Sequence, residues 1–144
     1  MYRSKYFSWW EMTFSGTAMK YNIDNTPGPE ETEHLKELMA VLDDIREKWG
    51  GPIRVSSGYR CSKVNTLVGG SKTSAHMRGY AADIKPCNNQ MKEFVAFMKE
   101  WAKDKDFDQL LEERDNQGGW WIHLGLYNKD NKQRHQIKYL YVEK

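Results

Sequence analysis

The spacing of apolar side chains predicts two amphipathic helices that share a core. Residues 29–49 and residues 88–103 both carry apolar side chains three or four positions apart, so each helix would bury one face. The sequence Gly50-Gly51-Pro52 ends the first of these helices, because glycine accepts a left-handed conformation and proline cannot continue a helix.

A shorter helix is expected near the N-terminus, where Ser8 and Glu11 match a capping box. Five aromatic side chains surround this segment, and we expect them to pack in the core rather than to form a ligand-facing surface. They are Tyr6, Phe7, Trp9, Trp10 and Phe14.

Short apolar segments predict four β-strands in the rest of the chain. They lie at residues 53–56, 81–85, 120–126 and 138–142. Residues 57–70 are expected to form a loop with one helical turn. Because helices come first and strands dominate later, the pattern favours an α+β fold with a mainly antiparallel sheet. The length of 144 residues favours a single domain over residues 1–144.

The composition is that of a globular protein, with 39% hydrophobic and 29% charged residues. The net charge is only +2 and the charges are scattered, so we expect no nucleic-acid partner. No apolar run approaches the roughly 20 residues that span a bilayer, so we expect no membrane insertion. The N-terminus lacks the apolar stretch of a signal peptide, which favours synthesis in the cytoplasm. We expect a monomer.

The two cysteines, Cys61 and Cys87, are too few for a disulfide framework and lack zinc-finger spacing. We expect two unpaired thiols. A bridge between the two cysteines remains an alternative, because each lies near a segment of the candidate site.

Three residues suggest metal chemistry from their surroundings alone. Asp83 lies in the apolar segment 81–84, where burying an unpaired carboxylate would be costly. His76 precedes a glycine turn, and His123 lies in another apolar segment. Two imidazoles and one carboxylate form a known catalytic zinc set, which leaves a fourth position for water. The alternative for each histidine is a structural or surface role.

The same residues carry a resemblance that covers nearly the whole chain. Their pattern resembles the signature of the zinc D-Ala-D-Ala carboxypeptidase family. That family includes phage L-alanyl-D-glutamate endopeptidases and D-Ala-D-Ala dipeptidases, and it shares its fold with the Hedgehog signalling domain. Residues 57–70 and 107–111 are similar to the segments that precede the first and last zinc ligands. The positions of the main pattern are Ser74, His76, Gly79, Ala81, Asp83, Trp121 and His123.

The resemblance implies a Hedgehog/DD-peptidase-like fold, in which N-terminal helices pack on the sheet that carries the metal site. It implies one zinc ion bound by His76, Asp83 and His123, with zinc-bound water as the nucleophile. The substrate would be a peptide bond of the peptidoglycan stem, cut by a D-Ala-D-Ala carboxypeptidase or by an endolysin-type endopeptidase. The compact form resembles phage or prophage lysins. We therefore expect action on the cell wall after release through a phage holin or on lysis.

The resemblance also implies contacts with the substrate. Arg60 would hold a carboxylate or polarise a carbonyl of the substrate. Ser74 would contact the substrate or the metal site. Gln109 would either contact the substrate or pair with backbone. Trp120 and Trp121 alternate across a strand, so one should be core and Trp121 could line the cleft.

One departure concerns the general base. Several branches of the family have an acid three residues before the last histidine, but this chain has Trp120 there. We therefore expect Glu113 to be the base, with Glu112 and Asp115 as alternatives. The same departure favours a second hypothesis, a catalytically inactive zinc-fold module that binds cell wall or a protein partner. The other histidines, His34 and His135, are expected on the surface.

Overall fold

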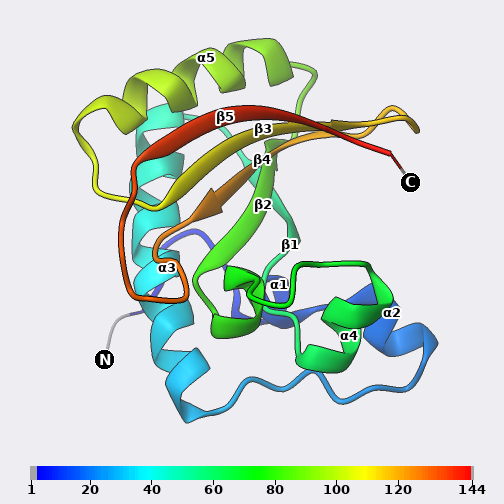
Figure 1. Ribbon diagram of the computed structural model, residues 1–144. Helices are drawn as coiled ribbons and strands as arrows, with labels where there is room; N and C mark the ends of the chain where they lie inside the picture. The colour runs from blue at the N-terminus through cyan, green and yellow to red at the C-terminus, as the bar shows by residue number, and fades with distance from the viewer. Residues whose placement is uncertain (1–2, 144) are drawn as a thin grey trace.

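The computed structural model describes residues 3–143 and contains a five-stranded sheet flanked by helices (Figure 1). The two N-terminal residues and Lys144, which belong to the predicted domain, lie outside the described residues. The helices are α1 (Trp9–Thr13), α2 (Gly16–Lys20), α3 (Pro29–Trp49), α4 (Ser62–Leu67), η1 (Ala75–Arg78), α5 (Met91–Trp101) and η2 (Ala102–Asp104). The strands are β1 (Ile53–Ser57), β2 (Ala81–Pro86), β3 (Gln109–Asp115), β4 (Trp120–Gly125) and β5 (Gln136–Val142).

The sheet has the strand order β1-β2-β4-β3-β5. Neighbouring strands are antiparallel, except that β5 runs parallel to β3 along the edge of the sheet (Figure 1). The prediction of an α+β fold with a mainly antiparallel sheet is therefore confirmed.

Strand β3 is not among the four strands that the apolar pattern predicts. Residues 112–115 are all charged, so the segment lacks the alternation that signals a half-buried strand. It is nevertheless a strand because β4 and β5 pair with its two edges and satisfy its backbone groups. Helix α2 was not predicted either, because five residues are too few to show a helical period.

Helices α3 and α5 contribute to the core together with one face of the sheet (Figure 1). Side chains alternate between the two faces of each strand, so every second residue of β2 and β4 enters this core. These core residues are Ala82, Ile84, Ile122 and Leu124. The residues between them, including Asp83 and His123, therefore point to the opposite face of the sheet, where a pocket lies.

The N-terminal aromatic residues divide between the core and the surface. The capping box of α1 is confirmed, because the Ser8 side chain accepts from the Glu11 backbone N–H and the Glu11 carboxylate accepts from the Ser8 N–H. Phe7 is buried and Tyr6 packs against the core. The core prediction is wrong for the other three aromatics, because a five-residue helix can turn only one narrow face inward, and Met12 occupies it. Those three are Trp9, Trp10 and Phe14.

The two histidines outside the candidate site differ in their packing. His34 is not a surface residue, because its ring stacks on Tyr80 at 3.9 Å and its Nδ1 lies 2.6 Å from the Arg78 carbonyl oxygen. His135 is exposed, as expected.

Cys61 and Cys87 are both free thiols, as expected. Among residues 3–143, no helix combines the length and the apolar character needed to cross a membrane.

Candidate metal centre

His76 is presented by η1, a single helical turn. The Ser74 Oγ caps this turn by accepting from the His76 backbone N–H at 3.2 Å. The His76 Nδ1 lies 2.8 Å from the Gly58 carbonyl oxygen, which can only accept, so Nδ1 carries the ring proton. The unprotonated Nε2 therefore faces Asp83 and is available as a metal ligand.

Gly79 ends η1 and allows the chain to turn from His76 into β2. Its φ is +81°, and a Cβ added here would lie 2.6 Å from the Glu31 carbonyl oxygen. We expect Gly79→Ala to destabilise the fold by about 2 to 4 kcal/mol, from the left-handed backbone and the clash with backbone of α3. Urea unfolding would measure this loss.

Gly16→Ala is the matched control, because a Cβ at Gly16 meets nothing within 4 Å. It should change the free energy of unfolding by less than about 0.5 kcal/mol. Equal stability of the Gly79→Ala variant and the wild-type protein would show that the tight approach of this turn to α3 is dispensable.

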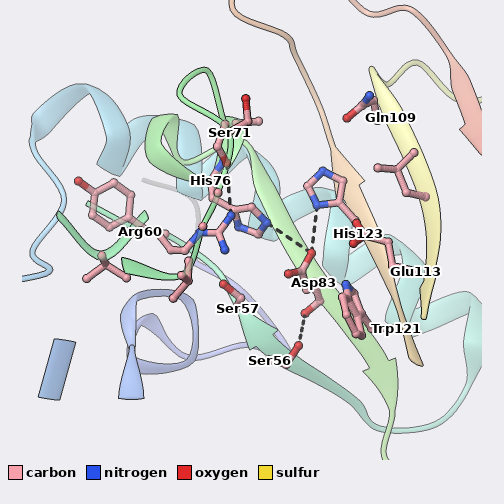
Figure 2. A pocket seen from close by; sticks show the side chains of 18 of the residues that line it. Ser56, Ser57, Arg60, Ser71, His76, Asp83, Gln109, Glu113, Trp121 and His123 are labelled. Carbon is pink, nitrogen blue, oxygen red and sulfur yellow. Dashed lines mark hydrogen bonds and ion pairs between the residues drawn. The ribbon is translucent and has the colours of Figure 1, made fainter. Parts of the chain in front are cut away.

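Asp83 and His123 are direct neighbours across the β2–β4 ladder, so the strand register alone brings them together. The His123 Nδ1 lies 3.0 Å from the Asp83 Oδ1, and the His76 Nε2 lies 3.4 Å from the same oxygen (Figure 2). The three predicted metal ligands thus meet at one point, although they come from η1, β2 and β4.

The donor set fits a zinc ion. Bonds of about 2.0–2.1 Å in a tetrahedron place neighbouring ligand atoms about 3.3 Å apart, close to both distances at the Asp83 oxygen. The ligand atoms of all three residues lie within 4.8 Å of one another. Two nitrogens and one oxygen suit zinc, and they leave a fourth position for water or substrate. His76, Asp83 and His123 can therefore hold a metal ion.

Asp83 also governs the protonation of this trio. Burial by itself would raise the pKa of Asp83, but the two imidazoles outweigh burial and hold that pKa far below its ordinary range. Burial lowers the pKa of His76 and favours the neutral ring. Burial is also the largest single effect on His123 and opposes its protonation, but the hydrogen bond to Asp83 and the negative charges of Asp83 and Glu113 together outweigh burial and raise the His123 pKa. An ionised carboxylate beside a neutral imidazole is the state that binds a metal.

An open pocket of about 790 Å³ surrounds the trio (Figure 2). The predicted substrate contacts all line it: Arg60, Ser74, Gln109 and Trp121. The Arg60 Nη2 lies 3.4 Å from the Ser74 Oγ. The Arg60 Nε is buried and has no hydrogen-bond partner among the described residues. Burial lowers the Arg60 pKa, and the negative charges of Asp83 and Glu113 oppose this effect.

The strand register separates the three acids considered as the general base. Glu113 pairs with Trp121 across the β3–β4 ladder and lines the pocket. Glu112 points to the other face, where its carboxylate accepts from the Trp120 indole at 3.0 Å. Asp115 accepts from the Gly119 backbone N–H at 2.6 Å and so organises the turn between β3 and β4. Only Glu113 of the three lines the pocket.

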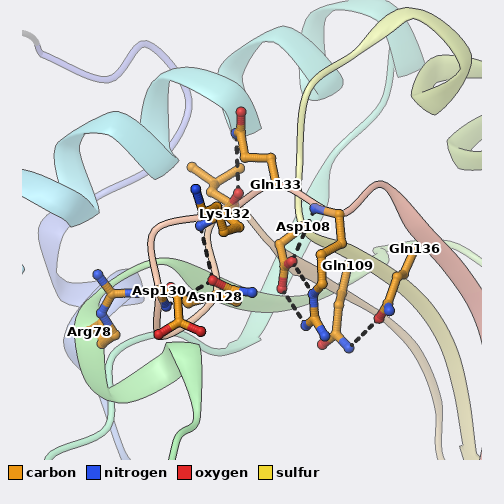
Figure 3. Close-up of polar contacts among 10 residues, drawn as sticks. Arg78, Asp108, Gln109, Asn128, Asp130, Lys132, Gln133 and Gln136 are labelled. Atoms are coloured by element: carbon orange, nitrogen blue, oxygen red, sulfur yellow. Dashed lines mark hydrogen bonds and ion pairs between the residues drawn. The ribbon is translucent and has the colours of Figure 1, made fainter.

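The pocket also includes residues that were not predicted as site residues. Asp108 is buried, and its two oxygens accept from the Arg134 guanidinium at 2.7 and 2.9 Å (Figure 3). Beside this pair, the Gln109 Nε2 donates to the Gln136 Oε1 at 3.1 Å. Substrate contact and pairing with backbone were the two alternatives for Gln109, and in the structure its side chain pairs with another side chain. No local sequence signal marks Arg134, because it reaches the pocket only through the return of the chain towards β5.

The loop between β4 and β5 is held against η1. Arg78 donates to the Asn128 carbonyl oxygen and, at 2.5 Å, to the Asn131 side chain. Asn128 and Lys129 from this loop line the pocket. The turn that carries His76 therefore also supports a wall of the pocket.

Two imidazoles and one carboxylate in an open pocket of an α+β protein form a metal-ligand set that is typical of a metal-dependent hydrolase. Residues 5–124 match the family described as Peptidase M15. The chain therefore belongs to this family of zinc-dependent metallopeptidases, and the predicted relationship to the zinc D-Ala-D-Ala carboxypeptidases is confirmed. A comparison with curated proteins finds no match.

Proposed function

We propose that this protein hydrolyses a peptide bond in the stem peptide of bacterial peptidoglycan, as a D-Ala-D-Ala carboxypeptidase or an endolysin-type endopeptidase. The observation that carries the proposal is the meeting of the metal-ligand trio with Glu113 and Arg60 in one open pocket. Membership of the Peptidase M15 family supports the peptidase chemistry.

Glu113 is the proposed general base. A single zinc ion, when bound, supplies a Lewis acid and lowers the pKa of water towards about 7. The Glu113 carboxylate accepts the proton from the attacking water and then donates it to the leaving amine. Leu111 is the partner of His123 in the β3–β4 ladder, and Glu113 lies two residues further along β3. Glu113 is therefore on the same face of the sheet as His123, which supports this role.

Arg60 is the proposed oxyanion stabiliser. Its guanidinium is held in the pocket wall, with the Ser74 hydroxyl beside it and its Nε otherwise unpartnered among residues 3–143. A cationic donor held in this way needs little reorganisation when negative charge develops on the scissile carbonyl oxygen. Ser74, Gln109 and Trp121, which line the same pocket, would contact the peptide on either side of the bond.

The position of Trp120 does not favour the inactive binding module. Side chains three residues apart on a regular strand point to opposite faces, so position 120 is turned away from His123. Trp120 packs against the core and bonds Glu112 there. A tryptophan at this position therefore removes no acid from the pocket.

The proposed place of action is the cell wall. Synthesis in the cytoplasm, followed by release through a phage holin or on lysis, would bring the enzyme to its polymeric substrate.

Digestion of purified peptidoglycan tests the function and names the bond. We expect the zinc-loaded protein to release soluble fragments, and we expect a chelator to stop the release until zinc is restored. Fragment masses distinguish loss of a terminal D-Ala from cleavage within the stem. Failure of the zinc-loaded protein to release fragments from walls of several stem chemistries would contradict the proposal.

A further inference from the structure

The two ends of the pocket differ in chemistry. The pocket-lining residues from segments 14–17 and 64–73, which do not include Lys72, are all uncharged and are rich in hydroxyl groups and glycine. The opposite end contains the charged residues Asp108, Lys129 and Arg134. Figure 1 shows α2 and α4, which border the neutral end, on one side of η1, and the chain that leads into β5 on the other. The neutral end suits an uncharged, hydroxylated ligand, whereas the charged end suits a peptide with ionised groups.

An exposed aromatic pair extends the neutral end outward. Phe14 lines the pocket, and Trp10 stacks on Phe14 with ring centroids 4.6 Å apart. Trp10 and Phe14, here called the aromatic rim, remain 65% and 39% exposed. Large exposed aromatic surfaces next to a pocket mark binding sites more often than stability devices, because leaving them in water gains nothing for folding.

The aromatic rim is fixed relative to Arg60. The Tyr59 backbone N–H donates to the Met12 carbonyl oxygen at 2.8 Å. The Asn25 side-chain amide donates to the carbonyl oxygens of Thr13 and Tyr59, at 3.0 Å each. These bonds tie the end of α1 to the segment that carries Arg60. A ligand on the aromatic rim would therefore be held at a defined distance from the pocket centre.

We propose that the aromatic rim is a sugar-binding subsite for the glycan strand to which the stem peptide is attached. A sugar ring has a flat C–H face that packs on an indole. The hydroxyl groups around the edge of the sugar ring can form hydrogen bonds with serine and threonine side chains. The stem is joined through an amide that consumes the lactyl carboxyl group, so the substituted glycan is uncharged and matches the neutral end. This inference rests on the proposed function, and it specifies the substrate as a stem still joined to its glycan.

The test compares two substrates that differ only in the sugar. One is a stem pentapeptide whose N-terminal amine is capped by a lactoyl group, and the other is the same pentapeptide on N-acetylglucosaminyl-N-acetylmuramic acid. We expect the wild-type kcat/KM to be about tenfold higher for the disaccharide-bearing substrate, the scale of one buried aromatic contact. Trp10→Ala should remove this preference and leave hydrolysis of the free peptide unchanged. Trp10→Tyr, which keeps a ring, should restore most of it.

Tyr139→Ala is the matched control, since Tyr139 is 54% exposed on β5 and does not line the pocket. It should keep the full preference. Calorimetric titration with the N-acetylglucosamine tetramer should detect binding to the wild-type protein and none to Trp10→Ala. Equal wild-type rates on the two substrates would contradict the sugar subsite and leave the proposed function standing. The same holds if Trp10→Ala lowers kcat/KM equally for both substrates. A wild-type protein that cleaves neither substrate would instead contradict the proposed function.

Discussion

Replacing His123 by alanine is expected to abolish stoichiometric zinc binding and, with it, peptidoglycan hydrolysis. The variant would keep two of the three protein ligands and lose the 3.0 Å contact that orients Asp83. Mutation of a residue that only hydrogen-bonds a metal ligand already lowers metal affinity by roughly 10- to 100-fold, so removal of a ligand should exceed this loss. Zinc content per chain after gel filtration, measured by mass spectrometry of the metal, would test the prediction.

His34→Gln is the matched control, because His34 is a half-buried histidine whose Nδ1 meets a backbone carbonyl oxygen outside the pocket. This variant should keep one zinc ion per chain. If the His123→Ala protein also keeps one zinc ion per chain, the ligand set proposed here is incorrect.

Replacing Glu113 by glutamine is expected to lower kcat by roughly 10²- to 10⁴-fold, the range that general acid–base catalysis contributes. The amide keeps the size of the side chain and can neither accept the proton from water nor return it to the leaving amine. Zinc content should stay at the wild-type level, because Glu113 is not one of the three clustered ligands. Single-turnover hydrolysis of a stem peptide, with zinc content measured on the same sample, separates the two effects.

Glu112→Gln provides a matched control on the opposite face of the same strand. Its carboxylate bonds the Trp120 indole instead of facing the pocket, so turnover should stay within about threefold of wild type. Full activity of the Glu113→Gln variant would show that another acid is the general base. A large loss of turnover in the Glu112→Gln variant would identify Glu112 as that acid.

Local patterns predicted the elements that bury one regular face. The long helix α3 and the helix α5 repeat apolar residues at helical spacing, and both contribute to the core as expected. Strand β3 was not predicted because its charged half has no apolar alternation. Its extended conformation results from pairing with β4 and β5. The exposure of Trp10 could not be predicted either, because it depends on which side of a five-residue helix meets the sheet.

The sequence by itself determined the family of this protein and the donor atoms it can offer a metal. His76, Gly79 and Asp83 lie within one short turn and strand, so their relation is local and readable from spacing. The tertiary structure decided the rest. His123 meets Asp83, 40 positions away in the sequence, through strand register, and strand register also turns Glu113 towards the pocket and Glu112 away from it. Strand pairing is a long-range interaction whose side-chain period is two, so a shift of a single residue would exchange these two acids.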